Sequence, residues 1–158
     1  MAQITLVRID DRLIHGQVVT AWLKYYDSDT ILITDDAVAK DTFMQRVLKS
    51  AAPKGVKVKA KSIADTIAFL NDPVNDSVKT MIIVKGPEAV EGLIDDGIGI
   101  DKVILGGMGI KAGRKKLNRN ISASEEEVNC MKRLEEKGAK IQYQLVPDDN
   151  PVLFSKMI

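Results

Sequence analysis

Residues 4–23 read ITLVRIDDRLIHGQVVTAWL and contain the features that decide how the chain folds. The apolar run at 4–7 predicts a buried strand over about residues 3–9, and helical spacing of apolar residues predicts a helix from residue 17. The apolar face of that helix is predicted to comprise Val18, Trp22 and Tyr25. His15, the only histidine, therefore lies in a strand-to-helix loop, where open α/β folds bind their ligands.

Strand and helix patterns continue to alternate after this first unit. Apolar runs predict further strands at about 30–34, 56–60, 80–84, 102–105, 116–121 and 141–145. Helical spacing and capping residues predict helices at about 38–51, 63–71, 87–96 and 124–137. Lysines alternate with apolar residues in 56–60, which is typical of an edge strand. The order predicts a single-domain α/β fold: a mainly parallel seven-stranded sheet with helices on both faces.

The segment that follows strand 102–105 interrupts the pattern. Only about ten residues, rich in Gly and Lys, precede 116–121, whereas a parallel crossover needs a dozen or more. We therefore expect the one antiparallel strand at about 116–121. Ser124 and Glu127 then predict a capping box for the next helix. The C-terminal residues 148–158 are expected to lie across the surface, docked by Val152, Leu153 and Phe154.

Length and composition limit the classes of function. At 158 residues, the chain is expected to form one domain over 1–158 that needs no disulfide to hold its core. The net charge of +1 argues against nucleic acid as a partner, since such proteins carry a large basic excess. Cys130 is alone, which fits a reducing cytoplasm. No signal peptide, membrane-spanning run or His/Cys cluster for a metal is evident, and no cofactor is expected.

Polar residues follow the predicted strands where the strands share one edge of the sheet. Asp10, Asp11, Arg12 and His15 come from the first loop. A neutral imidazole is a nucleophile at neutral pH, and a guanidinium matches the oxygens of a phosphoryl group with paired donors. These residue types together suit a phosphoryl group carried on the His15 ring, with Arg12 compensating its charge. Asp35 and Asp36 are expected to be helix caps.

Other positions are expected to support this site. One of Asp10 and Asp11 accepts a hydrogen bond from the imidazole ring or fixes Arg12, and the sequence leaves open which. Backbone amides of Gly16 and Gln17 at the helix start would add donors. The run Gly106, Gly107, Met108 and Gly109 allows close backbone approach by phosphate or a partner. A basic cluster that could dock an acidic partner surface comprises Lys111, Arg114, Lys115 and Lys116.

Four stretches carry a resemblance to a known family. They are RIDDRLIHGQVVTAW at 8–22, VKGPE at 84–88, GGMGIKAGRKK at 106–116 and GAKIQYQLVPDD at 138–149. Together they resemble the enzyme IIB component of the mannose/fructose/sorbose family of the sugar phosphotransferase system, over essentially the whole chain. The resemblance implies a seven-stranded sheet with one antiparallel strand.

The same resemblance implies an activity and partners. Nδ1 of His15 would accept a phosphoryl group from a phosphohistidine of the IIA partner and pass it to a sugar bound by the membrane IIC and IID subunits. The chain would then be a cytoplasmic protein-Nπ-phosphohistidine–sugar phosphotransferase, peripherally associated with its membrane transporter. It would need no cofactor or metal. The sugar, the oligomeric state and the strand order are left open.

Three alternatives compete with this interpretation. A two-component receiver domain is also a small α/β domain, but its acceptor aspartate follows the third strand, where this chain has no acid before Asp65. A nucleotidyl transferase with a His-Gly loop normally has a second histidine, which is absent here. A non-catalytic α/β binding module, with a structural His15, is the third.

Overall fold

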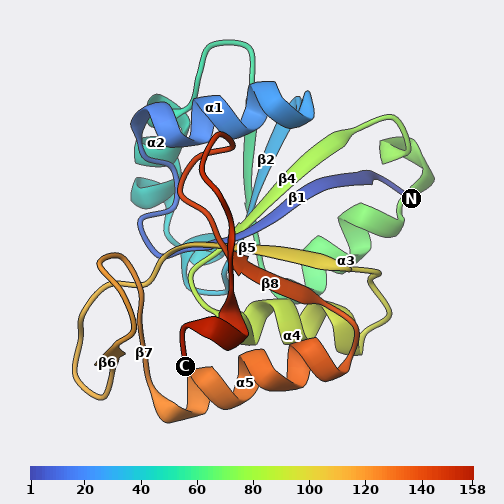
Figure 1. Cartoon of the computed structure of the whole chain (residues 1–158). Coiled ribbons are helices and arrows are strands. Elements are labelled where there is room, and N and C mark those ends of the chain that lie inside the picture. Colours follow the sequence, from blue (N-terminus) through green and yellow to red (C-terminus); the bar gives the residue numbers. More distant parts are fainter.

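The computed structural model describes residues 1–158 and shows a sheet covered by helices on both faces (Figure 1). Six of its seven strands run parallel, and the last runs antiparallel to its neighbour. This confirms the predicted mainly parallel seven-stranded sheet with one antiparallel strand. In spatial order the strands are β3 (Lys57–Lys61), β2 (Thr30–Thr34), β4 (Lys79–Val84), β1 (Gln3–Asp10), β5 (Lys102–Gly107), β8 (Lys140–Tyr143) and β9 (Val152–Leu153).

Two apolar cores lie on opposite sides of this sheet. The first packs beneath α1 (Gly16–Tyr26) and α2 (Thr42–Ala51). The second packs beneath α3 (Ile63–Asn71), α4 (Pro87–Asp95) and α5 (Glu125–Glu136). Short 3₁₀ turns at Val38–Lys40, Pro73–Asn75 and Phe154–Lys156 complete the helical elements. None of the helices has both the length and the apolar character needed to cross a bilayer.

After neighbouring central strands, the chain continues to helices on opposite faces of the sheet. β1 leads to α1 on one face, whereas its neighbours β4 and β5 lead towards α4 and α5 on the other face (Figure 1). Where the chain diverges in this way, a crevice forms beyond the carboxyl ends of the strands, and α/β proteins bind ligands there. The loop with His15 leaves from β1 at this point.

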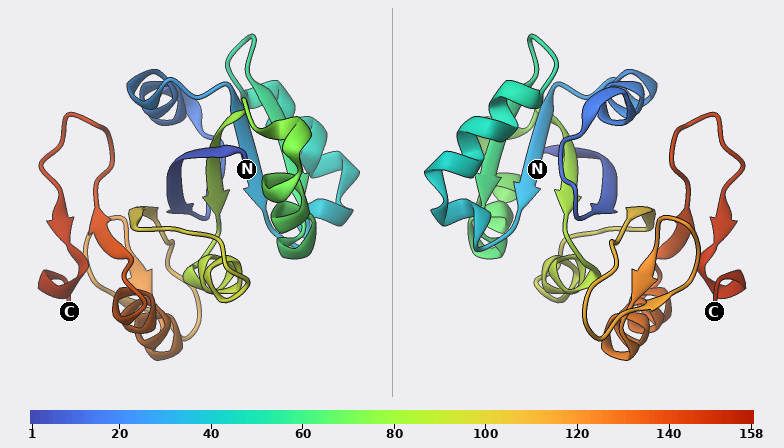
Figure 2. Two further views of the ribbon diagram at one scale, coloured as in Figure 1. Left: turned by 90° about the vertical axis from the view of Figure 1, so that its right-hand side faces the viewer. Right: turned by 90° about the vertical axis from the view of Figure 1, so that its left-hand side faces the viewer.

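The antiparallel strand lies elsewhere than predicted. β6 (Lys115–Lys116) and β7 (Ser122–Ala123), within and beside the predicted strand 116–121, pair only with each other, in a separate two-stranded ribbon. Lys115 and Lys116 are exposed, so these residues are unsuited to a buried sheet. The antiparallel strand of the main sheet is β9, which forms a hairpin with β8 at one edge (Figure 2).

Some predicted inward positions were also wrong. The buried residues of α1 are Val19, Trp22 and Leu23, and Val18 packs partly buried against the same core as predicted, while Tyr25 is 64% exposed. Helix 38–51 is divided into a 3₁₀ turn and α2, because Asp41 caps α2 by accepting from the backbone N–H of Met44. At the C-terminus only Phe154 is buried; Val152 and Leu153 are exposed on β9.

Local capping signals were confirmed. Ser62 caps α3, and Ser124 and Glu127 form the reciprocal capping box of α5. The lysine-alternating strand β3 is an edge strand, as predicted. The caps fix the residues at which α3 and α5 begin, and therefore where the loops that precede these helices end.

Candidate active site

The β1–α1 loop is held down by its own apolar residues. Leu13 adopts a left-handed backbone conformation, with φ of 61°, and its side chain and that of Ile14 are buried in the core under α1. A non-glycine residue with positive φ is uncommon and persists only where its surroundings enforce it. Burying these two side chains turns their neighbours outward: Arg12 is 42% exposed and His15 30% exposed.

Asp10, the last residue of β1, is the centre of the polar contacts. Its side chain is 1% exposed. Nε and Nη2 of Arg12 donate to its two oxygens at 2.9 and 3.0 Å, and the backbone N–H of Arg12 donates at 3.1 Å. Nη2 of the buried Arg8 donates to Oδ2 of Asp10 at 3.3 Å. Nε2 of His15 lies 3.3 Å from Oδ2 of the same carboxylate.

The charges around Asp10 keep its carboxylate ionised. Burial alone would raise the pKa of Asp10, but the hydrogen bonds from Arg12 and the positive charges of Arg8 and Arg12 outweigh it and lower the pKa below its usual value. The same carboxylate raises the pKa of Arg12. Asp10 is therefore an acceptor only, so a hydrogen bond to His15 places the ring proton on Nε2.

That hydrogen bond leaves the other ring nitrogen, Nδ1, with a free lone pair. His15 is also the N-cap residue of α1, and its side chain makes no capping bond to the helix. The first turn of α1 contains no acidic residue, so its backbone N–H groups have no carboxylate partner. Gly16 and Gln17, the first residues of α1, therefore directly follow the ring with N–H groups that no capping side chain takes up.

Two glycines of β5 make room for this arrangement. A Cβ added to Gly106 would collide with the guanidinium of Arg8. A Cβ added to Gly107 would lie 2.7 Å from Oδ1 of Asp10 and 2.8 Å from Nη2 of Arg12. Arg12 also donates to the Gly106 carbonyl at 3.3 Å. The close backbone approach predicted for the glycine run therefore serves the side chains of β1 and its loop.

Asp11 faces a different set of partners. Its Oδ2 accepts from the backbone N–H of Gly109 at 2.8 Å and from Nη1 of Arg114 at 3.2 Å. Arg114 is 4% exposed and makes a two-pronged ion pair with Glu127, the capping-box residue of α5, at 2.9 and 2.8 Å. Asp11 thus ties the β1–α1 loop to the β5–α5 connection, and its side chain makes no hydrogen bond to His15 or Arg12.

The remaining predicted positions are placed as follows. Asp35 accepts from the N–H groups of Ala37 and Val38, and Asp36 accepts from that of Ile63. Both satisfy N–H groups at helix starts, but the N-cap residues themselves are Ala37 and Ser62. The side chain of Met108 is buried, and its backbone pairs with Asn120 and Ser122, so Met108 offers no free group to the site. Arg114 does not belong to the exposed basic cluster, since its charge is taken up by Asp11 and Glu127. The chain has no group of three or more His, Cys, Asp or Glu side chains placed to hold a metal ion.

Comparison with known proteins assigns the family. Residues 4–158 match the family model described as "PTS system sorbose subfamily IIB component". The chain belongs to this family of sugar phosphotransferase IIB components. It is 36% identical over 146 residues to the "PTS system sorbose-specific EIIB component" of Lacticaseibacillus casei, covering 92% of this chain and 89% of that one.

Two further relatives extend the comparison. The "PTS system mannose-specific EIIAB component" of Escherichia coli (strain K12) is 35% identical over 92% of this chain and 45% of its own length. The crystal structure of the IIBSor domain of the sorbose permease from Klebsiella pneumoniae superposes with a TM-score of 0.95, at 32% identity, over 98% of this chain and 95% of that one. The fold of this IIB component is thus that of its solved relatives.

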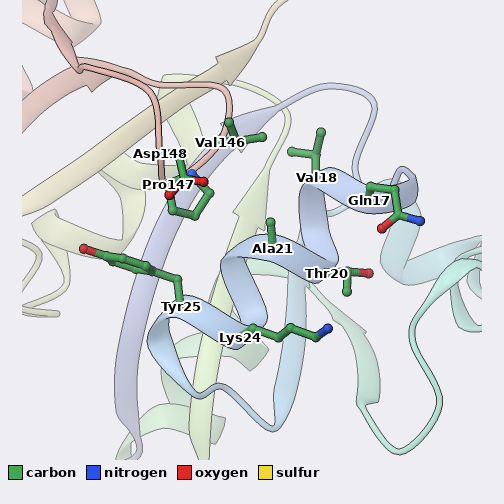
Figure 3. A pocket seen from close by; sticks show the side chains of 9 residues that line it. All are labelled: Gln17, Val18, Thr20, Ala21, Lys24, Tyr25, Val146, Pro147 and Asp148. Carbon is green, nitrogen blue, oxygen red and sulfur yellow. The ribbon is translucent and has the colours of Figure 1, made fainter.

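A groove of about 650 Å³ runs beside the site of this IIB component. It lies between α1 and the β8–β9 loop, with side chains from both walls facing it (Figure 3). Gln17, two residues after His15, lines it at the helix start. Nε1 of Trp22 donates to the carbonyl of Leu145 at 2.9 Å and so fixes the loop wall against the helix.

Sequence reasoning did not identify Arg8 of this IIB component, and it placed Arg114 in an exposed docking cluster instead of a buried ion pair. Arg8 lies under Asp10 within β1, and Arg114 bridges the two loops. A charged residue inside the otherwise apolar run of β1 was a usable signal for Arg8, since arginine is rarely buried without a partner. Arg114 had no such signal, because it is one of several basic residues in a glycine-rich segment.

Proposed function

We propose that this IIB component carries a phosphoryl group on Nδ1 of His15, as a protein-Nπ-phosphohistidine–sugar phosphotransferase. The observation that supports this most directly is the orientation of the ring. Nε2 faces the buried, ionised Asp10, and Nδ1 is left without a hydrogen-bond partner on the residue that directly precedes the uncapped start of α1. The domain over 1–158 would act as one unit, because core, caps and site belong to the same sheet.

The first step is an attack by the Nδ1 lone pair on the phosphorus of a phosphohistidine on the IIA partner. The new P–Nδ1 bond forms as the donor P–N bond breaks, and the electron pair of that bond returns to the donor imidazole. The phosphorylated His15 ring then carries both the phosphoryl group and the Nε2 proton, so it is positively charged. Asp10 compensates that charge, in the way that a buried aspartate stabilises an imidazolium in hydrolase triads.

Stabilisation of the transferred group falls to Arg12 and the helix start. Phosphoryl transfer depends on positioning and on neutralising the equatorial oxygens. The exposed guanidinium of Arg12 shares Oδ2 of Asp10 with the His15 ring, and the N–H groups of Gly16 and Gln17 are unpaired by any cap. Of the glycine run, Gly106 and Gly107 border this site, since their carbonyls accept from Nη2 of Arg12 and from the backbone N–H of Asp11.

In the second step a sugar hydroxyl takes the group. An O–P bond forms, the P–Nδ1 bond breaks with its electron pair returning to the ring, and the hydroxyl proton leaves to the acceptor side. We place the sugar on the membrane IIC and IID subunits, with this chain in the cytoplasm and peripherally associated with them. The relative named EIIAB joins IIA and IIB components in one name, which supports a IIA protein as donor.

Transfer of ³²P from phosphorylated IIA components tests the proposal. His15→Ala should take no label, whereas Lys49→Ala, an exposed change on α2, should take label like the wild type. Both variants should fold, since surface substitutions usually alter stability by less than about 0.5 kcal/mol. The labelled bond should be acid-labile and base-stable. Labelling of His15→Ala, or an acid-stable product, would refute the proposal.

A further inference from the structure

Arg8 is the buried charge of the site that the phosphoryl chemistry above does not use. It lies in the middle of the sheet, between Ile83 of β4 and Ile104 of β5, and its side chain is 1% exposed. Arg8 and Asp10 are two residues apart on β1, so both point to the face that α1 covers. A guanidinium at this depth needs an explanation, since arginine is almost never fully buried without a reason.

Contacts on several sides fix the Arg8 guanidinium. Nη2 donates to Oδ2 of Asp10 at 3.3 Å, and Nη1 donates to the carbonyl of Gln144 at 3.1 Å. The guanidinium carbon lies 5.6 Å from the ring centre of Trp22, within cation–π range. Gly106 lies so close that a Cβ there would collide with it. The group therefore has no freedom to turn towards solvent.

Arg8 is a poor choice for stability alone. Its Nε is buried without any hydrogen-bond partner, and unpaired buried donors cost stability. Burial lowers the pKa of Arg8, and Asp10 only partly offsets that effect. Apolar residues of similar volume often serve a core as well as a buried ion pair does. Stability therefore does not account for Arg8, whereas its contact with Asp10 offers a role in the chemistry.

We propose that the two arginines on Asp10 divide their roles, with Arg8 as a positioning residue and Arg12 as the phosphate ligand. In the structure, Nε and Nη2 of Arg12 are both engaged by Asp10. To pair with phosphoryl oxygens, the exposed Arg12 turns from Asp10. Arg8 cannot follow, so it keeps Asp10 ionised and directed at Nε2 of His15 while Arg12 is away. This role rests on the proposed phosphorylation of His15.

The ring tautomer of His15 tests the role without any partner protein. ¹⁵N NMR of the neutral imidazole should show mainly the Nε2–H form in the wild type. Arg12→Met should keep that form, since Arg8 still holds Asp10. Arg8→Met alone should also keep it, because Nε and Nη2 of Arg12 still hold Asp10 in the unphosphorylated protein. The double variant Arg8→Met/Arg12→Met should give a mixture of the two tautomers, since neither guanidinium then holds Asp10. The proposal is overturned if the double variant retains the wild-type tautomer, or if Arg12→Met alone loses it.

Transfer kinetics give the second measurement. At saturating phosphorylated IIA component, Arg8→Met should lower kcat about tenfold, as loss of an orienting second partner typically does. The KM for the donor should stay within about twofold, because the buried Arg8 touches no docking surface. An unchanged kcat, or a KM change alone, would contradict the positioning role.

Arg8→Lys keeps the test decisive if Arg8→Met does not fold. Its ammonium retains the charge beside Asp10, although it lacks the fork that also reaches Gln144. In the Arg12→Met background we expect Arg8→Lys to keep mainly the Nε2–H tautomer, and as a single change we expect it to recover most of kcat. If Arg8→Lys folds but loses as much kcat as expected for Arg8→Met and shows mixed tautomers in the Arg12→Met background, the role assigned to the charge is overturned. If wild-type protein takes no label while the tautomers behave as predicted, the phosphorylation proposal fails and the positioning of His15 stands.

Discussion

At the residue scale, the polar groups of the site converge on one of two adjacent carboxylates. Asp10 contacts Arg8, Arg12 and His15, whereas Asp11 turns to the β5–α5 connection. The sequence left this choice open because it depends on the register between β1 and β5. That register shifts between Ile9, which pairs with Leu105, and Asp10, which pairs with Gly107, and only the three-dimensional pairing reveals the shift.

The matched pair Asp10→Asn and Asp11→Asn separates the two roles. Asp10→Asn should lower the transfer rate by about 10²-fold or more, because an amide neither fixes the Nε2–H tautomer nor compensates the charged ring. It should also lower the free energy of unfolding by about 3 kcal/mol, since Arg8 is left as an unpaired buried charge. Asp11→Asn should keep most of the transfer rate. Equal rate losses in single-turnover assays of the two variants would contradict this division.

The glycines of β5 allow a sharp test of packing around the arginines. Gly106→Ala forces a Cβ into the buried guanidinium of Arg8 and should lower the free energy of unfolding by about 1–3 kcal/mol. Gly109→Ala is the control, because its Cβ would lie 3.6 Å from Asp11 in ordinary contact. Urea unfolding of both variants gives the comparison. A Gly106→Ala protein as stable as Gly109→Ala would show that Arg8 has more room than the structure gives it.

At the element scale, segments that are continuous apolar runs were predicted most closely from the sequence. The strands β2, β4 and β5 were predicted closely because they are continuous apolar runs that no other element type explains as well. The connection 108–124 was not, since it is rich in Gly and Lys and lacks apolar periodicity. Its shape is set by contacts between distant residues, chiefly Arg114 with Asp11 and Glu127, which sequence spacing does not show.

Arg114 should therefore stabilise this connection. Arg114→Met leaves Glu127 and Asp11 without their shared cation and should lower the free energy of unfolding by about 3 kcal/mol, as breaking a buried ion pair does. Lys115→Met, the exposed neighbour on β6, should change stability by less than about 0.5 kcal/mol. Thermal unfolding followed by circular dichroism distinguishes them. If both variants melt with the wild type, the ion pair does not hold the connection.

At the scale of the whole molecule, acidic side chains with lowered pKa values link stability to pH. Hydrogen bonds from Arg133 lower the pKa of Glu91 to about 2 against its ordinary 4.5, with Lys137 assisting. Burial opposes the shift at Glu127, but Arg114 still lowers the pKa of that carboxyl. Asp10 behaves likewise, as described above. Each of these groups binds protons more readily when the chain is unfolded, so protons favour unfolding.

The free energy of unfolding should therefore fall as the solution is acidified. The contribution of each such carboxylate is fully present above its unfolded pKa and is lost as pH falls through the folded one; for Glu91 this window runs from about 4.5 down to about 2. Glu91→Gln should be less stable than the wild type at pH 7 and should converge with it towards pH 2 in urea titrations. Glu136→Gln, an exposed change without an ion pair on the same helix as Arg133, should show no such convergence. A gap between Glu91→Gln and the wild type that stays constant across this window would mean that the Glu91 carboxylate is not stabilised by its cations in the folded state.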